Sequence, residues 1–83
     1  MKTYTSPSDL LRDRCRSLWD SLTEDQQMEL EYALDYTGME LRVSRHIVRT
    51  VDAITDTVLA VDSFQDWVAY SIKWAKEEVE RYA

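Results

Sequence analysis

Few residues of this 83-residue chain could do catalytic chemistry, and their spacing does not bring them together. Cys15 is the single cysteine and His46 the single histidine, so a catalytic triad would need residues from distant segments. Cys15 lies on the apolar stripe of a predicted helix, which indicates a packing thiol rather than a nucleophile. His46 has Arg45 before it and Arg49 after it, which favours a surface, packing or pH-sensing role. We therefore expect no catalytic site and no enzyme.

The carboxylates also lack the usual pattern of a metal site. Helical bundles bind metals through repeated Glu-x-x-His motifs or through several inward carboxylates, and the sequence lacks that motif. Asp52 and Asp56 are four residues apart on one predicted helical face, where ion pairs with Arg45 and Arg49 explain them. A magnesium-dependent enzyme using these acids is the alternative. The sequence contains neither a phosphate-binding loop nor a dinucleotide glycine pattern, so we expect no cofactor.

Charge is distributed in blocks along the chain, whose net charge is −6. Residues 17–41 contain no Lys or Arg but seven acids: Asp20, Glu24, Asp25, Glu29, Glu31, Asp35 and Glu40. A short basic segment follows, with Arg42, Arg45 and Arg49 on one face of the predicted helix. The negative balance disfavours direct binding to nucleic acid, which needs a cationic surface. It suits either solubility or contact with a basic protein surface.

The apolar spacing predicts an all-α fold in which helices position these charges. We expect one domain over residues 1–83, with a flexible tail at 1–5. The predicted helices of the compact bundle cover residues 7–21, 24–37, 43–61 and 63–82. Only one glycine is present, and the absence of Asn-Gly and Asp-Gly turns argues against β-hairpins.

The predicted helix 43–61 is the element that the others pack against. Its apolar residues recur at steps of four and three: Ile47, Val51, Ile54, Val58 and Val61. The preceding Met39, Leu41 and Val43 alternate as in a strand, but no other segment offers a partner strand, so we interpret them as a connector or the start of this helix. Asp62-Ser63 is the only break before the last helix, and one continuous helix is the alternative.

Two sets of side chains are candidates for binding a protein partner. The acidic set contains Asp20, Glu24, Asp25, Glu29, Glu31 and Asp35, and the aromatic set contains Trp67, Tyr70 and Trp74. Trp and Tyr are favoured anchors at interfaces, and clustered carboxylates attract basic surfaces. The alternative is that the acids only keep the chain soluble and that the aromatic residues complete the core.

These features predict a small protein-binding module that occludes a basic partner surface, as a stoichiometric inhibitor or a nucleic-acid mimic. The profile is similar to that of many small inhibitors carried by phages and mobile elements. The alternative is a homo-oligomeric structural or regulatory module that buries the 43–61 stripe or the aromatic set. No apolar run is long enough for a membrane span, and no signal pattern is present, so we expect a cytoplasmic protein.

Overall fold

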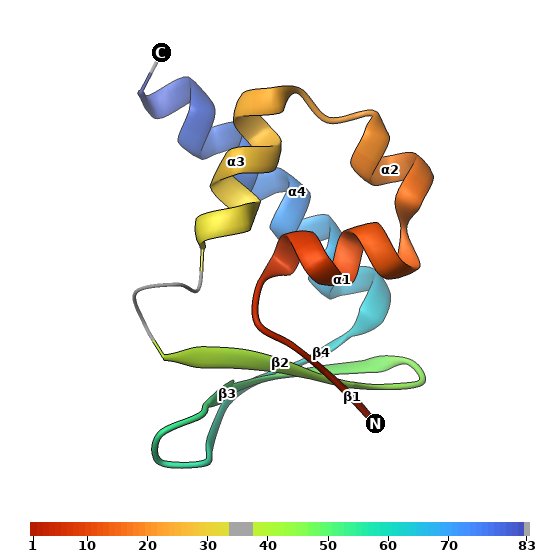
Figure 1. Ribbon diagram of the computed structural model, residues 1–83, viewed down its shortest axis with the longest axis vertical. Coiled ribbons are helices and arrows are strands. Elements are labelled where there is room, and N and C mark those ends of the chain that lie inside the picture. Colours follow the sequence, from red (N-terminus) through yellow and green to blue (C-terminus); the bar gives the residue numbers. More distant parts are fainter. Residues whose placement is uncertain (34–37, 83) are drawn as a thin grey trace.

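The computed structural model describes residues 1–33 and 38–82, and these residues form an α+β fold (Figure 1). An antiparallel sheet has the strand order β1-β2-β3-β4, and the helices lie over one of its faces. The strands are β1 (Lys2–Tyr4), β2 (Met39–Ser44), β3 (Ile47–Asp52) and β4 (Thr57–Ser63). The helices are α1 (Pro7–Arg14), α2 (Arg16–Asp20), α3 (Glu24–Tyr32) and α4 (Phe64–Arg81). The predicted all-α bundle of four helices is therefore wrong.

The predicted helix 43–61 is replaced by two β-hairpins that join β2, β3 and β4. Val, Ile and Thr dominate this segment. β-branched side chains lose rotamer freedom in a helix and pack well on a pleated sheet. The alternating residues Met39, Leu41 and Val43 form strand β2, not a connector. The missing partner strand lies inside the segment that we predicted to be a helix.

The steps of four and three that suggested a helix have a different origin. Ile47 and Val51 are four residues apart and therefore share one face of β3. The step to Ile54 leaves the strand and enters the loop between β3 and β4. The step from Val58 to Val61 spans a β-bulge, which returns both side chains to the same face of β4. A loop and a bulge together imitated the helical period.

Both hairpins turn without glycine, contrary to the expectation that led us to reject a β structure. The β2–β3 turn is Arg45-His46, and Arg45 has a left-handed backbone with φ of 46°. The β3–β4 turn begins at Asp52, whose Oδ1 accepts hydrogen bonds of 3.0 and 3.3 Å from two backbone N–H groups of the loop. It ends at Asp56, which is also left-handed with φ of 58°. A side-chain-capped turn and two strained residues replace the usual glycines.

Three of the four predicted helix starts, at residues 7, 24 and 63, agree with the structure to within one residue, whereas the start at residue 43 is wrong because it lies in β2. Ser6 Oγ accepts a 3.3 Å hydrogen bond from the backbone of α1, and Thr23 forms a capping box at the start of α3. Ser63 caps α4 and is also the last residue of β4, so the continuous helix 43–82 is wrong. The predicted helix 7–21 is divided at Cys15, whose φ of −137° ends α1 before α2 begins.

Two further predicted segments are the helix at residues 24–37 and the tail at residues 1–5. The predicted helix 24–37 is helical from Glu24 to Tyr32, and residues 34–37, including Asp35, lie outside the described residues. Gly38, the residue after this undescribed stretch, has a left-handed backbone with φ of 68°. The expected tail at residues 1–5 contains strand β1, which pairs with β2 and buries Tyr4.

The hydrophobic core lies between the helices and the inner face of the sheet, which we define as the face that carries Leu41, Val43 and Val48. Leu41 and Val48 are 1% and 0% exposed. The helices add Leu10, Leu11, Trp19, Leu30, Trp67 and Ala75 to this core. The outer face carries Arg49 and Val51, and in the described residues no helix lies over it (Figure 1). None of the described helices is both long and apolar enough to cross a membrane.

Candidate partner-binding surface

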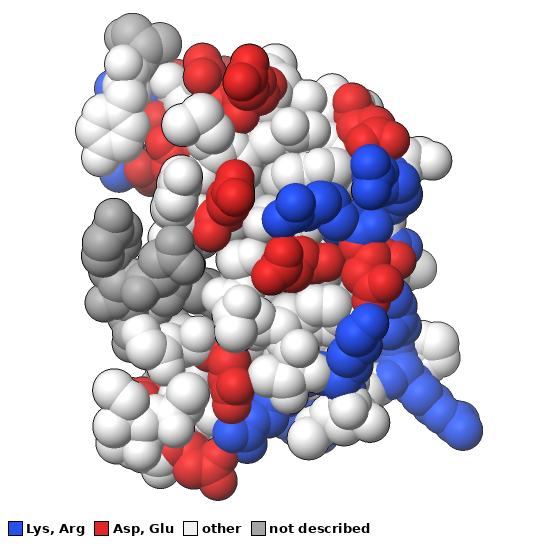
Figure 2. Space-filling view, in the orientation of Figure 1, with Lys and Arg blue, Asp and Glu red and all other residues white. Residues whose placement is uncertain are grey.

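Helix α3 presents carboxylates that have no counter-charge. Glu24, Asp25, Glu29 and Glu31 all lie on this helix, and Thr23 fixes its start. In the described residues, no Lys, Arg or His comes within 4.0 Å of these four carboxylates. The two acids of the first turn face the positive end of the helix dipole, which stabilises the helix. Figure 2 shows acidic atoms over this part of the helical layer, whereas acidic and basic atoms alternate over α1 and α2.

Apolar side chains are interleaved with these acids. Asp25, Met28, Glu29 and Tyr32 follow the i, i+3, i+4, i+7 pattern of one helical face. Met28 is 49% exposed and Tyr32 is 51% exposed, although side chains of this size are usually buried. This stripe therefore combines negative charge with uncovered apolar area, a combination that suits a basic and partly apolar binding partner.

Two hollows lie along the seam between α3 and α4. One, of about 200 Å³, is lined by Asp25, Met28, Glu29, Val79 and Tyr82. The other, of about 220 Å³, is lined by Pro7, Leu30, Ala33, Tyr70, Ser71 and Trp74. The first is partly acidic and the second is mainly apolar. We call α3 together with these two hollows the acidic seam.

The predicted aromatic set divides into a core residue and two surface residues. Trp67 is 6% exposed and stacks near Phe64 with ring centroids 6.4 Å apart, so it belongs to the core. Tyr70 is 60% exposed and Trp74 is 38% exposed, and both line the second hollow. Of the predicted aromatic set, only these two residues lie at the surface, about one turn apart on α4.

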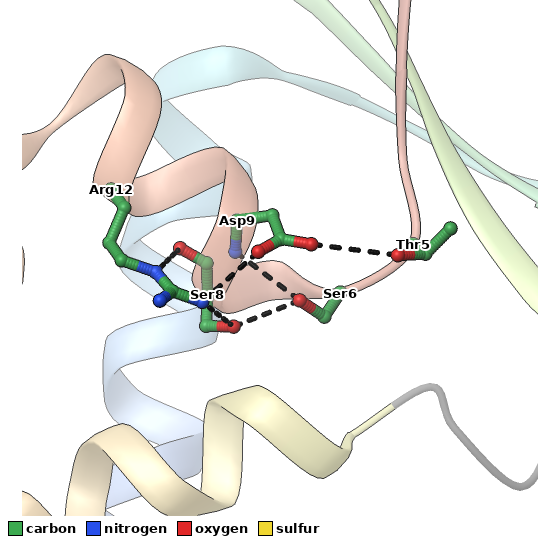
Figure 3. Close-up of polar contacts among 5 residues, drawn as sticks. All are labelled: Thr5, Ser6, Ser8, Asp9 and Arg12. Atoms are coloured by element: carbon green, nitrogen blue, oxygen red, sulfur yellow. Dashed lines mark hydrogen bonds and ion pairs between the residues drawn. The ribbon is translucent and has the colours of Figure 1, made fainter.

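A polar network holds the start of α1 beside the second hollow (Figure 3). Ser6 Oγ and Ser8 Oγ are 2.9 Å apart, and Ser8 is fully buried. Arg12 Nη2 donates to Ser8 Oγ at 3.2 Å and to Asp9 Oδ1 at 3.0 Å. Because buried hydroxyls need partners, this network fixes the backbone around Pro7, which lines the hollow. The sequence pattern signalled the Ser6 cap but not the burial of Ser8.

No family model, curated protein or solved structure matches this chain.

Asp20, the first of the predicted partner-binding acids, lies apart from the acidic seam. It is on α2, where its carboxylate accepts a 3.2 Å hydrogen bond from Arg16 Nε. This exposed pair follows the i, i+4 spacing, which stabilises a helix by a few tenths of a kcal/mol. Asp20 thus already has a counter-charge, and the candidate surface is restricted to the acids of α3.

The arginines that we placed on one helical face occupy two different sites. Arg42 and Arg49 are cross-strand partners on the outer face of the sheet. Arg42 Nη2 contacts Glu40 Oε1 at 2.8 Å and Asp56 Oδ1 at 2.6 Å, and the hydrogen bonds from Arg42 to these two acids raise its pKa. Asp56 is therefore held by Arg42, not by the arginines that we expected.

Asp52 and Asp56 do not form a metal site with neighbouring acids. Asp52 uses its Oδ1 to close the β3–β4 turn, and Asp56 is engaged with Arg42. Within residues 1–33 and 38–82, no cluster of three or more His, Cys, Asp or Glu residues could hold a metal ion.

A group of basic side chains lies at the β2–β3 turn. An open hollow of about 840 Å³ is lined by Lys2, Arg14, Arg45 and His46, together with Val43 and Ile47. Arg14 lies over the Phe64 ring at 5.5 Å, and its Nη2 is 3.5 Å from the carbonyl oxygen of Arg45. This basic corner lies at the end of the sheet that holds the β2–β3 turn, whereas α3 lies in the helical layer (Figure 1).

The single cysteine and the single histidine lie in different elements of the fold. Cys15 joins α1 to α2 and packs against the core, and burial raises the pKa of its thiol. A raised pKa keeps the thiol protonated at neutral pH and lowers its nucleophilicity. His46 is exposed in the β2–β3 turn, and its backbone oxygen accepts the 2.6 Å bond from Phe64 that links this turn to α4.

Proposed function

We propose that this protein is a small binding module whose acidic seam engages a basic, partly apolar segment of a partner protein and occludes it. Such a module acts as a stoichiometric inhibitor, and its carboxylates stand where a nucleic-acid backbone would stand on the partner. We also propose that it acts in the cytoplasm, where the free thiol of Cys15 would stay reduced.

The observation that carries the proposal is the unpaired charge of α3. Elsewhere in the described residues the acids are often neutralised locally, as in Asp9 with Arg12, Asp20 with Arg16 and Glu40 with Arg42. The four acids of α3 have no such partner, so their field extends into solvent and accelerates the approach of a basic surface.

The exposed apolar side chains make this surface more than a solubilising face. Acids that only maintain solubility need no exposed Met28, Tyr32 or Trp74 beside them. Large apolar groups provide affinity once charge has oriented the partner, because burying them removes apolar area from water. A basic amphipathic helix meets both requirements, with cations toward α3 and apolar residues in the hollows.

The test replaces the four acids by their amides in the variant E24Q/D25N/E29Q/E31Q, which conserves side-chain shape. The control variant D62N/D66N/E77Q/E80Q removes the same number of charges from β4 and α4. Each protein is used as bait in lysate of the source cells at about 50 mM and about 500 mM salt, where electrostatic screening differs strongly. The captured protein is then titrated by calorimetry.

We expect the α3 variant to lose at least about tenfold in affinity, because complementary charge and desolvated charge pairs are both removed. The control variant should bind within about twofold of the original chain, because its charges lie outside the acidic seam and contribute only a screened, long-range attraction. Circular dichroism checks that both variants remain folded. Equal affinity of the α3 variant and the original chain, with both folded, would refute the role of the acidic seam.

A further inference from the structure

The two edges of the sheet are protected to very different degrees. β1 forms one edge, and it is only three residues long. It carries Lys2, whose Nζ contacts Asp13 Oδ2 of α1 at 2.8 Å. Short length and a charged residue are two devices by which natural sheets avoid pairing with other chains. The β1 edge is therefore blocked.

β4 forms the opposite edge and lacks these devices. It extends over seven residues, from Thr57 to Ser63, and contains no Lys, Arg or Pro. All of its residues except Asp62 are exposed, including Val58, Leu59 and Val61 at 50%, 52% and 58%. An exposed apolar edge strand presents unpaired backbone N–H and C=O groups together with apolar side chains, which is a template for strand addition.

We propose that β4 pairs with β4 of a second copy of this chain and forms a symmetric dimer with a continuous antiparallel sheet. The edge of an antiparallel strand is complementary to itself across a two-fold axis, because the same N–H and C=O groups alternate in both directions. A second copy supplies a partner strand of matching length and apolar character.

The charges of β4 favour this self-pairing and indicate its register. Asp62 is the only charged residue of the strand, so a two-fold axis at Asp62 would oppose two carboxylates. An axis at Val61 instead places Asp62 opposite Ala60 and places Val61 opposite its own copy. This register also uses the part of β4 that lies beyond the β-bulge and is regularly paired with β3.

The wider charge distribution is compatible with two copies meeting at this edge. The net charge of −6 opposes self-association in general. The unpaired acids of α3 belong to the helical layer, however, and Asp56 next to β4 is neutralised by Arg42. The charge within β4 itself is that of Asp62, which the Val61 register places opposite Ala60 and not opposite its own copy. Because one strand edge is a small contact, we expect a weak dimer with a Kd of roughly 1 to 100 µM.

The experiment measures molar mass by sedimentation equilibrium from about 1 µM to about 1 mM, a range that brackets this affinity. The variants V61K and V61E each oppose two like charges across the proposed axis. Each alone should be monomeric at concentrations where the original chain is dimeric, with at least about a tenfold increase in Kd. An equimolar mixture of the two should recover a dimer, because Lys then faces Glu.

The matched control is A69K, since Ala69 is exposed on α4 and lies outside both β4 and the acidic seam. This variant should dimerise as the original chain does. Circular dichroism identifies any variant that fails to fold, and the V61K/V61E mixture tests the register independently of stability. A monomeric original chain at about 1 mM would overturn the proposal. So would dimers that persist in V61K and V61E alone, a mixture that remains monomeric, or loss of the dimer in A69K.

Discussion

At the scale of single residues, several side chains stabilise the fold in ways that a pattern of apolar spacing does not reveal. Asp13 is the clearest example, because it joins β1 to α1. Its Oδ2 accepts hydrogen bonds from Lys2 Nζ and from the Tyr4 hydroxyl, and these bonds lower the pKa of Asp13. Burial of the Tyr4 ring, followed by the bond to Asp13, raises the pKa of the phenol. The carboxylate is thus matched to two donors.

The lowered pKa of Asp13 predicts a pH-dependent contribution to stability. A carboxyl whose pKa is lower in the folded state stabilises the fold above its unfolded pKa, near 4, and loses this contribution as the pH falls through the folded pKa. The variant D13N should therefore be less stable than the original chain at pH 7. The difference should shrink below about pH 4. Urea denaturation at pH 7 and pH 3 measures this, and an unchanged difference at both pH values would contradict it.

Arg45 carries backbone strain in the β2–β3 turn. The left-handed conformation destabilises a residue other than glycine by roughly 1 kcal/mol. Replacement by glycine removes this strain, but glycine also makes the unfolded chain more flexible, which offsets part of the gain in stability. We predict that R45G increases the free energy of unfolding by about 0.5 kcal/mol. Thermal unfolding measures the effect, with R16G as a control in which glycine enters helix α2 and should destabilise. A decrease in stability for R45G would show that its side chain, and not its backbone, dominates.

At the scale of elements, α3 is attached to the remainder of the molecule mainly by one face. Leu30 is 1% exposed in the core beneath this helix, whereas most of the other side of α3 faces solvent. The helix that carries the proposed binding acids therefore depends on a small apolar contact area, in addition to the Thr23 capping box.

The variant L30A should destabilise the fold by about 2 to 5 kcal/mol, because it removes a buried side chain and leaves a cavity. Total stabilities of domains are about 5 to 15 kcal/mol, so this loss is large for a chain of 83 residues. Met28 on the same helix is half-exposed and provides the comparison. The variant M28A should lower the free energy of unfolding by less than about 1 kcal/mol. Urea denaturation distinguishes them, and equal losses would show that α3 packs through a different face.

Sequence patterns located the helix starts well and the sheet poorly. Ser6, Thr23 and Ser63 are local signals, since each cap depends on residues three positions away. Only the pairing of β1 with β2, such as Thr3 with Arg42, lies outside any local window. The two hairpins are local, and they were missed because a loop and a β-bulge imitated the period of a helix. The expectation that hairpins need glycine failed, because Arg45 and Asp56 adopt the left-handed conformation that glycine usually supplies. The Asp52 side chain and the pairing of the flanking strands stabilise these turns. Of the candidate surface, the acids of α3 and the aromatic residues Tyr70 and Trp74 were evident from the sequence, but how far Met28 and Tyr32 are exposed was not.

At the scale of the whole molecule, charge is separated from the apolar edge. The described residues span 35 × 25 × 17 Å, with the acidic seam in the helical layer and β4 at the border of the sheet. The two proposed contacts thus use different surfaces, and each can exist without the other. They also depend on different forces, electrostatic attraction at the seam and strand pairing between copies of like net charge at the edge.

Opposite salt dependence of the two contacts is the expected result. Salt weakens attraction between the acidic seam and a basic partner, but it screens the repulsion between two copies that each carry a charge of −6. Raising the salt from about 50 to about 500 mM should lower partner affinity severalfold and raise the dimer fraction. Sedimentation and calorimetry on the same protein stock measure both effects. A dimer that dissociates with salt would show that ion pairs hold it.

Ser63 ends β4 and caps α4, so the strand passes into the helix with no linker residue between them. One inserted residue at this joint would rotate α4 by about 100° about its axis. Such a rotation would turn Trp67 and Ala75 away from the sheet that they cover. Length variation should consequently be tolerated in the loop at residues 53–56 and forbidden at Ser63. The number of residues at this joint therefore determines which face of α4 packs against the sheet.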